Sequence, residues 1–351
     1  TRHQIGESTL GLLILVLGFG AVSAMLFSGR LIAKLGGRAV LTIFSLAAIP
    51  VLPLVVFAPN LWLLTPILAV FGAVVGCMDV AMNAQAVEVE RRLHRAIMSS
   101  SHGFWSLGGF IGGSAGSYLI AHLGAEHQSL VAAAVAATLV FGAMPFLLPT
   151  APVAATTEAP ARHHLLPRDL GLWLLGFMAF FSMVPEGAVL DWAAIYLQKE
   201  LGSDVFRSGL AFAFFAGAMA VMRFAGDHAR NRFGAVRTLR VSGLVGAAGL
   251  MGGALAPADW FAIVSFALAG LGVANMVPIM FSAAGNRPDV PSAVGISTVT
   301  MVGYAGILIA PSVIERVEFI PGGFSAEYGG YQSSVINLIS KSGANKPDLF
   351  F

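Results

Sequence analysis

The turn Lys34-Leu35-Gly36 returns 198 positions later in the chain as Arg232-Phe233-Gly234. Glycines repeat with the same spacing: Gly11, Gly36, Gly72 and Gly108 recur as Gly209, Gly234, Gly270 and Gly306. A tandem repeat of a long hydrophobic unit is typical of transporters that are built from two related halves. The repeat therefore predicts two pseudo-symmetric halves of one fold.

The composition requires a lipid bilayer as the solvent for most of the chain. Hydrophobic residues make up 57%, charged residues only 11%, and the mean hydropathy is +0.81. Soluble domains carry about 25% charged residues, so a soluble core is excluded. The single cysteine, Cys77, excludes an intramolecular disulfide and a Cys-rich metal site. We expect no metal site, no cofactor and no nucleic-acid partner.

Apolar runs of about 20 residues mark spanning helices. Ten such runs are present, at 9–29, 40–58, 61–85, 97–122, 128–149, 170–192, 207–226, 239–256, 260–281 and 292–314. We predict an all-α membrane protein with about ten transmembrane helices. Its parts are an N-terminal half at 1–149, a Pro/Ala/Thr-rich linker at 150–168, a C-terminal half at 169–314 and a tail at 315–351.

Lys and Arg are distributed unevenly between the two sets of alternate loops. One set holds thirteen of them and the opposite set holds three. The basic loops of membrane proteins face the cytoplasm, so the richer set and the linker at 150–168 are expected on that side.

The repeat also indicates what each half lacks. The run at 170–192 has no counterpart 198 positions earlier, and the counterpart of 128–149 falls on the polar stretch near 326–347. Compared with two complete six-helix halves, the spacing predicts that the first and last helices are missing.

Several motifs carry a resemblance to a known family. The stretch from Gly29 to Gly36, and Asn231-Arg232-Phe233-Gly234, resemble the loop between helices two and three of the major facilitator superfamily. Residues 76–83 resemble the fourth helix of the fucose–proton symporter group, where a carboxylate occupies the position of Asp79. Residues 79–90 followed by 102–108 are similar to a bacterial subgroup. The resemblance covers about 1–313 and implies helices 2–6 and 7–11 of a transporter in the bacterial inner membrane.

The tail resembles a different family. Residues 314–318, 321–329 and 335–343 look like part of the plug domain of TonB-dependent receptors. Short β-type runs at 317–320 and 334–339 are separated by Gly-rich turns. We interpret the tail as the product of a junction between unrelated coding sequences near 313–315; the alternative is a natural cytoplasmic tail.

Three ionisable residues are candidates for proton coupling. Asp79 shares a helix face with Gly72, Gly76 and Asn83, and a carboxylate at this depth must face protein or water. His102 opens the next span at a similar depth and forms an Asp–His pair in this interpretation. Glu186 follows Pro185, which is expected to kink its helix. The alternatives are a structural acid that clamps helices and a histidine bonded to a backbone carbonyl.

The candidates for substrate binding are polar or aromatic residues inside spans: Asn83, Trp105, Asn275 and Ser282. Trp105 can stack on a sugar ring or simply pack. Asn275 and Ser282 share a face with Pro278 between them, and the alternative for Asn275 is a hydrogen bond between helices.

A second group of charged and polar residues lies at the cytoplasmic ends and is a candidate gate. Its members are Arg30, Lys34, Arg38, Asn231, Arg232, Arg223 and Asp227. Solvated helix ends are the alternative explanation for these residues.

The favoured function is secondary transport of a small polar solute, a sugar or metabolite, by a monomer coupled to protons. The sequence has no P-loop, which argues against ATP drive, and no metalloprotease or nucleophile-elbow motif, which argues against an enzyme. The remaining alternatives are a truncated chimera without activity and a receptor fragment defined by the tail.

Overall fold

The computed structural model describes residues 7–149, 167, 169–320 and 335–340 of the chain. The first half consists of α1 (Glu7–Leu35), α2 (Gly37–Phe57), α3 (Leu61–Leu93), α4 (Met98–Ala143) and the 3-10 turn η1 (Met144–Phe146). The second half consists of α5 (Leu170–Lys199), α6 (Val205–Phe233), α7 (Ala235–Ala254), α8 (Asp259–Val273), α9 (Met276–Gly285) and α10 (Ser292–Val313).

These helices account for all ten predicted spans. Two spans lie in α4, which Gly124 interrupts with a φ of 83°, and one span is divided between α8 and α9. Among the described residues, seven helices are long and apolar enough to cross a membrane. The observed helices are often longer than the apolar runs. Helix α3 continues to Leu93, and its last turns carry charged residues because they extend beyond the apolar layer. The predicted all-α membrane fold is confirmed.

The repeat of the sequence is also a repeat of the backbone. Under the spacing that relates Gly36 to Gly234, α6 begins and ends at the positions equivalent to the two ends of α1. Helices α7 and α8 likewise begin at the positions equivalent to the first residues of α2 and α3. The turn glycines Gly36 and Gly234 have φ angles of 85° and 82°, a conformation that side chains other than glycine rarely adopt.

The same repeat sets the closest helix contacts in each half. A Cβ added to Gly72 of α3 would strike the carbonyl of Leu17 on α1. A Cβ added to Gly270 of α8 would strike the carbonyl of Phe215 on α6, and both residues are the repeat equivalents of the first pair. Small residues permit such close approach in lipid, where there is no hydrophobic drive between helices.

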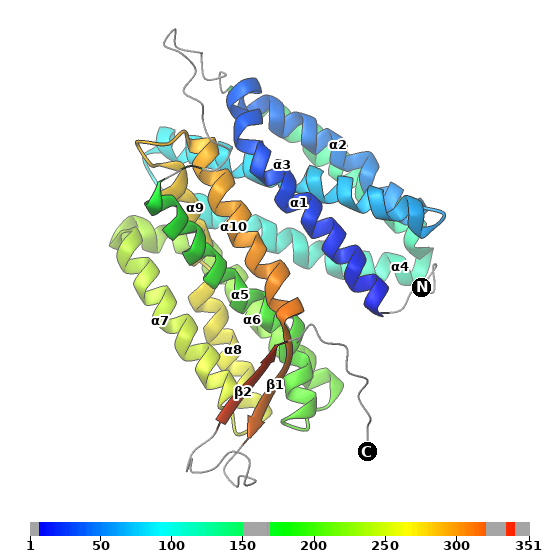
Figure 1. The fold of residues 1–351 in the computed structure, drawn as a ribbon, viewed down its shortest axis with the longest axis vertical. Coiled ribbons are helices and arrows are strands. Elements are labelled where there is room, and N and C mark those ends of the chain that lie inside the picture. Colours follow the sequence, from blue (N-terminus) through cyan, green and yellow to red (C-terminus); the bar gives the residue numbers. More distant parts are fainter. Residues whose placement is uncertain (1–6, 150–166, 168, 321–334, 341–351) are drawn as a thin grey trace.

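The two halves share one buried core. Met25, Val80 and Met98 from the first half pack in the same cluster as Met280 and Ile296 from the second. Helix α1 lies along α10, and α4 packs against α6 (Figure 1). These contacts place the inward-facing residues of α3, α4, α6 and α10 at the junction between the halves.

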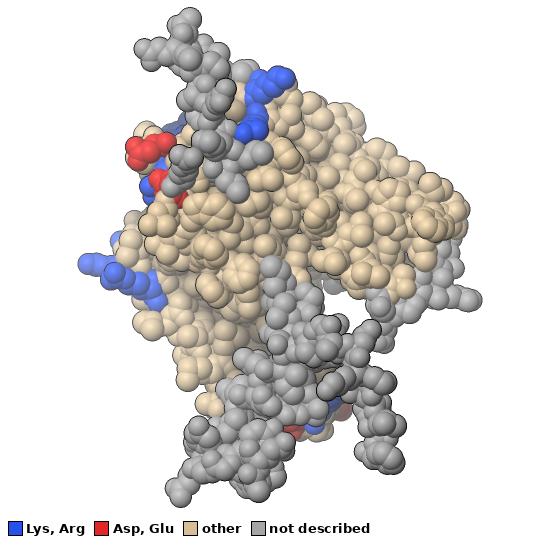
Figure 2. Space-filling model, in the orientation of Figure 1, with Lys and Arg blue, Asp and Glu red and all other residues tan. Residues whose placement is uncertain are grey.

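The outer surface suits a bilayer. Large apolar side chains stand exposed on it, including Trp62 at 90%, Phe110 at 73% and Leu244 at 73%. Most of the visible flank carries no charge, and Lys, Arg, Asp and Glu gather at the margins (Figure 2). We call the end that holds residues 35–37, 93–98, 233–235 and 285–292 the basic end.

The tail forms two paired strands, β1 (Ile314–Ile320) and β2 (Val335–Ser340). They are antiparallel, with Val317 opposite Leu338 and Phe319 opposite Ile336. The predicted β-type runs coincide with these strands. A two-stranded ribbon occurs in many folds, so the resemblance to a plug domain stays a prediction.

Candidate functional site

Helix α3 carries a stripe of small and polar residues that faces protein. Gly72 and Gly76 lie against the backbone of α1, at Leu17 and Ala21. One to two turns further on, Asp79 is buried, with 4% of its surface exposed. Among the described residues, its Oδ2 has no hydrogen-bond partner. A carboxyl group at this depth without a complete set of partners is costly, which makes Asp79 a candidate functional residue.

Asn83 links α3 to α4. Its Nδ2 donates to the backbone carbonyl of Asp79 over 3.0 Å, and its Oδ1 lies 3.2 Å from Nε2 of His102. The ring of His102 also packs on Phe281 of α9, with centroids 5.7 Å apart. Asp79 and His102, the predicted Asp–His pair, are therefore linked through Asn83, which bonds the backbone of Asp79 and the ring of His102.

Arg223 of α6 connects the halves at this level. Its Nη1 donates to Oγ of Ser106 on α4 over 2.5 Å, and its Nη2 lies 3.4 Å from Oε2 of Glu186 on α5. The sequence placed Arg223 in the gate because it precedes Asp227 by four residues. The structure places it here instead, because its side chain extends toward the break between α8 and α9.

The break itself explains what holds Arg223. Pro278 has no backbone N–H, so the carbonyl of Ala274, four residues earlier, cannot make its helical hydrogen bond. That carbonyl accepts a hydrogen bond from Nε of Arg223 over 3.4 Å. We call the group at this junction the central polar cluster; it comprises Asp79, Asn83, His102, Ser106, Glu186 and Arg223.

Two further residues border this cluster. Tyr304 of α10 interacts electrostatically with Asp79, Glu186 and Arg223. Asn275 is fully buried at the α8–α9 break, and both polar atoms of its amide lack a partner among the described residues. Trp105 is 51% exposed, and no hydrogen bond to the cluster is found for it in the described part of the chain. Its role in binding solute stays a prediction.

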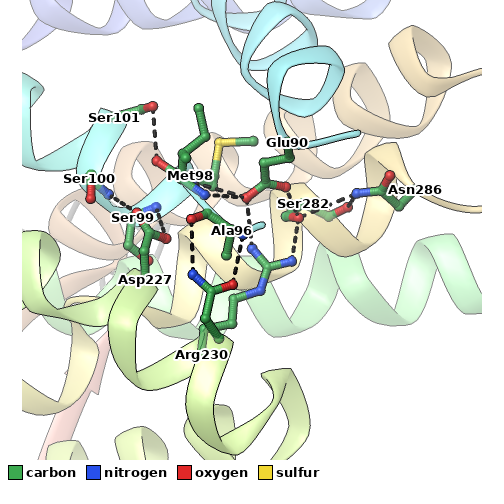
Figure 3. A network of polar contacts seen from close by, with 12 residues as sticks. Glu90, Ala96, Met98, Ser99, Ser100, Ser101, Asp227, Arg230, Ser282 and Asn286 are labelled. Atoms are coloured by element: carbon green, nitrogen blue, oxygen red, sulfur yellow. Dashed lines mark hydrogen bonds and ion pairs between the residues drawn. The ribbon is translucent and has the colours of Figure 1, made fainter. Parts of the chain in front are cut away.

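A second polar network joins the halves at the basic end (Figure 3). Oε1 of Glu90 on α3 forms an ion pair with Nη1 of Arg230 on α6 at 3.0 Å. The other oxygen of Glu90 accepts a hydrogen bond from Ser282 of α9, and Nη2 of Arg230 donates to Ser282 over 2.6 Å. Glu90 also accepts from the amides of Ile97 and Met98, over 2.9 and 3.1 Å.

Ser282 was predicted to bind solute together with Asn275, and its observed position differs. It is two turns closer to the basic end than Asn275, and there it bonds Glu90 and Arg230. A shared helix face gives direction around the axis but not depth along it.

The N-terminus of α4 is held by the opposite half. Asp227 of α6 accepts from the amides of Ser99 and Ser100 over 3.0 and 2.7 Å, and Asn231 bonds both the N–H and the carbonyl of Ala96. A carboxylate at a helix N-terminus satisfies free amides and opposes the positive end of the helix dipole. Arg91 adds a bond to the carbonyl of Gly285 over 2.5 Å.

The other predicted gate residues lie around this network. Arg30 and Lys34 are exposed, Arg38 donates to the Met144 carbonyl within its own half, and Arg232 lies over the ring of Phe233. The contacts between halves at this end therefore come mainly from Asp227, Asn231 and Arg230. Arg230 and Ser106 are not among the residues predicted from the sequence to form a site, although Ser106 follows His102 by four residues on the same face.

The comparisons with known proteins agree with this architecture. The model of the Major Facilitator Superfamily matches residues 1–311. The chain belongs to this superfamily. An uncharacterized MFS-type transporter of Yersinia pestis is 35% identical over 314 residues, which cover 89% of this chain and 80% of the relative. The membrane protein MosC of Rhizobium meliloti is 31% identical over 319 residues, covering 90% of this chain and 76% of MosC.

Solved structures of the superfamily share the fold. FucP in the outward conformation superposes with a TM-score of 0.67 at 17% identity, over 88% of this chain and 83% of FucP. The proton:xylose symporter XylE gives a TM-score of 0.64 at 13% identity, over 88% and 79%. At these identities the likeness concerns the fold alone. Superfamily membership establishes a multi-pass membrane transporter for small solutes rather than an enzyme.

Proposed function

We propose that this protein is a proton-coupled secondary transporter for a small polar solute, a sugar or metabolite, that works by alternating access. The observation that carries the proposal is the central polar cluster at the junction of the halves, with Asp79 buried and one carboxyl oxygen unpartnered among the described residues. Solute sites of such transporters lie between the two repeats near the middle of the bilayer. FucP is a fucose:proton symporter and XylE a proton:xylose symporter, which supports the same class here.

Asp79 is the proposed coupling residue. An ionised carboxylate in the bilayer interior is destabilised when it lacks partners, so a buried Asp79 is favoured in the protonated form. When the halves move and water reaches it, the proton is released. Asn83 and His102 then connect this site to α4, and Glu186 supplies a second carboxyl group close to Arg223.

The basic end is proposed to face the cytoplasm of a bacterium, because Lys and Arg concentrate in cytoplasmic loops. In this orientation the network of Glu90, Arg230, Ser282 and Asp227 closes the cytoplasmic side, and the structure corresponds to an outward-facing state. Transport then requires these contacts to break as the halves at 1–149 and 169–314 rock against each other about the central cluster. We propose that a monomer carries out this cycle.

The test is uptake into proteoliposomes with an imposed proton gradient and a panel of labelled sugars and metabolites. Asp79→Asn is expected to abolish accumulation driven by protons and to leave solute exchange without a gradient intact, because the variant binds solute but carries no proton. Asp204→Asn is the matched control, since Asp204 caps α6 at the opposite end. Accumulation that survives in Asp79→Asn would remove Asp79 as the coupling residue.

A further inference from the structure

Arg223 is held in position from behind, independently of Glu186. Its side chain is only 6% exposed, Nη1 has a short bond to Ser106, and Nε donates over 3.4 Å to the carbonyl that Pro278 leaves free at Ala274. Burial and these two contacts keep the guanidinium group in place when Glu186 moves away.

The two terminal nitrogens of Arg223, Nη1 and Nη2, lie at different distances from their partners. Nη1 has a short bond of 2.5 Å to Ser106, whereas the ion pair of Nη2 with Glu186 spans 3.4 Å. Charge-assisted bonds between guanidinium and carboxylate are usually about 2.7–2.9 Å and often bidentate. Glu186 is also partly accessible, with 30% of its side chain exposed. The pair is thus a loose one, in which Arg223 is fixed and Glu186 can be displaced.

We propose that the central polar cluster takes an anionic solute, whose carboxylate binds Arg223 in place of Glu186. The proposal rests on the transport function proposed above and names its substrate class. The planar fork of Arg matches a carboxylate in a way that a neutral sugar does not exploit. The hydroxyl of Ser106, from the opposite half, lies beside the same fork.

The exchange balances charge. When the solute carboxylate displaces Glu186, the freed carboxylate takes up one proton from Asp79, which regains a proton from the water, so one solute anion and one proton enter together. The net charge of the cluster stays the same. The titratable and charged groups near Glu186 in this step are Arg223 on α6, which pairs with it, and Tyr304 on α10, which also faces Asp79 of α3. His102 of α4 faces Arg223. A cationic solute would instead be repelled by the fixed guanidinium group.

The test is ligand-dependent thermal stabilisation of the full chain in detergent, with paired probes that differ only in a carboxylate. One pair is D-glucuronate and D-glucose, and the panel extends to other sugar acids and hydroxy acids with their neutral counterparts. At least one carboxylate is expected to stabilise the wild type more than its neutral counterpart does. Arg223→Gln is expected to weaken that binding roughly 10- to 100-fold, as for loss of a charged hydrogen bond.

Glu186→Gln separates binding from folding. This variant is expected to bind the carboxylate more tightly than the wild type, because the internal competitor for Arg223 is gone, while accumulation by a proton gradient falls. A purely structural ion pair would give the opposite result for binding. Arg232→Gln, which removes an exposed arginine at the basic end, is the control and should bind as the wild type does.

The proposal is overturned if no carboxylate stabilises the wild type more than its neutral counterpart, or if Glu186→Gln weakens carboxylate binding. These results leave the proposed function standing when a neutral solute is taken up together with protons in proteoliposomes. Absence of proton-linked uptake for every solute of the panel, by contrast, removes the proposed function itself.

Discussion

The two halves of the molecule repeat the positions of three helices and differ in their buried charges. Helices α1, α2 and α3 are matched in the second half by α6, α7 and α8, which begin at the equivalent positions of the repeat. The glycine contact of Gly72 with Leu17 is reproduced by Gly270 with Phe215. The turns at Gly36 and Gly234 have nearly the same φ. The repeat therefore preserves what each half needs in order to fold.

The buried charged residues and Asn83 do not repeat. Asp79 and Asn83 of α3 correspond to Val277 and Phe281 in the second half, and Glu90 corresponds to Pro288. In the other direction, Arg223, Asp227 and Arg230 of α6 correspond to Met25, Gly29 and Ile32 of α1.

The charges that do repeat, Lys34 and Arg232, are both exposed at the basic end. The repeated glycines thus shape the helix contacts within each half. The unrepeated Glu90, Asp227 and Arg230 make contacts between the halves, which the proposed transport cycle must break.

The largest expected effect is a loss of stability when a contact between the halves is removed, compared with a contact within one helix. Glu90→Gln removes one partner of the buried pair with Arg230, and breaking a buried pair costs about 3–5 kcal/mol. Glu88→Gln removes an exposed pair with Arg92, a change of at most about 1 kcal/mol. Glu90→Gln should open the basic end and Glu88→Gln should not. Distances between spin labels at positions 95 and 232 measure this opening.

Equal label distances in Glu90→Gln and the wild type would show that the network does not hold the basic end closed. In that case, contacts across the junction, such as that of Glu90, would have no more effect on the basic end than contacts within one helix, such as that of Glu88.

A second prediction concerns the repeated glycines. Gly72→Ala and Gly270→Ala should each lower stability by about 1–3 kcal/mol, because an added methyl group strikes a backbone carbonyl of the neighbouring helix. Gly11→Ala and Gly209→Ala are matched controls that are also repeat equivalents of each other, with nothing within 4 Å of the added atom. They should be neutral or slightly stabilising in their helices. Thermal unfolding in detergent compares the four variants.

Similar losses of stability in Gly72→Ala and Gly270→Ala would support the equivalence of the two helix contacts. A loss in only one variant would mean that one half accommodates the added methyl group and the other does not.

The smallest expected effect is on the pH dependence of stability, and it concerns Asp169, whose partners among the described residues all lie in the second half. The amide of Leu172, and then Arg287, hold the pKa of the Asp169 carboxyl below its usual range at the start of α5. A group with a lowered pKa in the folded protein stabilises it above the unfolded pKa of about 3.9 and loses this effect as the pH falls through the folded pKa. The stability difference between wild type and Asp169→Asn should therefore be present near pH 6 and shrink toward pH 3.

Thermal midpoints across this pH range provide the measurement. Because Asp169 and Arg287 both belong to the second half, the label distance across the basic end should not change in Asp169→Asn. A changed distance would contradict the separation between contacts within a half and contacts across the junction.

Much of this organisation was predictable from the sequence. Runs of apolar residues located the helices of both halves, and the glycine spacing paired the halves, because both signals come from local composition. The same reasoning selected Asp79 and Glu186 as candidates, since a charge inside an apolar run is conspicuous, and both lie in the central polar cluster. It did not identify Ser106 or Arg230, because a serine in a helix and an arginine near its end are common and carry no local signal.

The position of a residue along the helix axis, and so the layer of the junction that it reaches, was poorly predicted from the sequence. Asp227 and Arg223 lie on the same side of α6, yet they belong to the basic-end network and the central cluster respectively. Ser282 and Asn275 are divided in the same way between the two sites. Helical periodicity gives the face of a residue, and only packed neighbours reveal which layer of the junction it reaches.

The sequence by itself determined the solvent of this protein, its spans, the duplicated halves and the basic end, because these follow from hydropathy, periodicity and charge along the chain. Only the tertiary structure decided which side chains meet across the junction. Arg223 bonds Ser106, and Glu90 bonds Arg230, although these partners lie far apart in the sequence. Such partners depend on how the two halves pack, and no local pattern encodes that geometry.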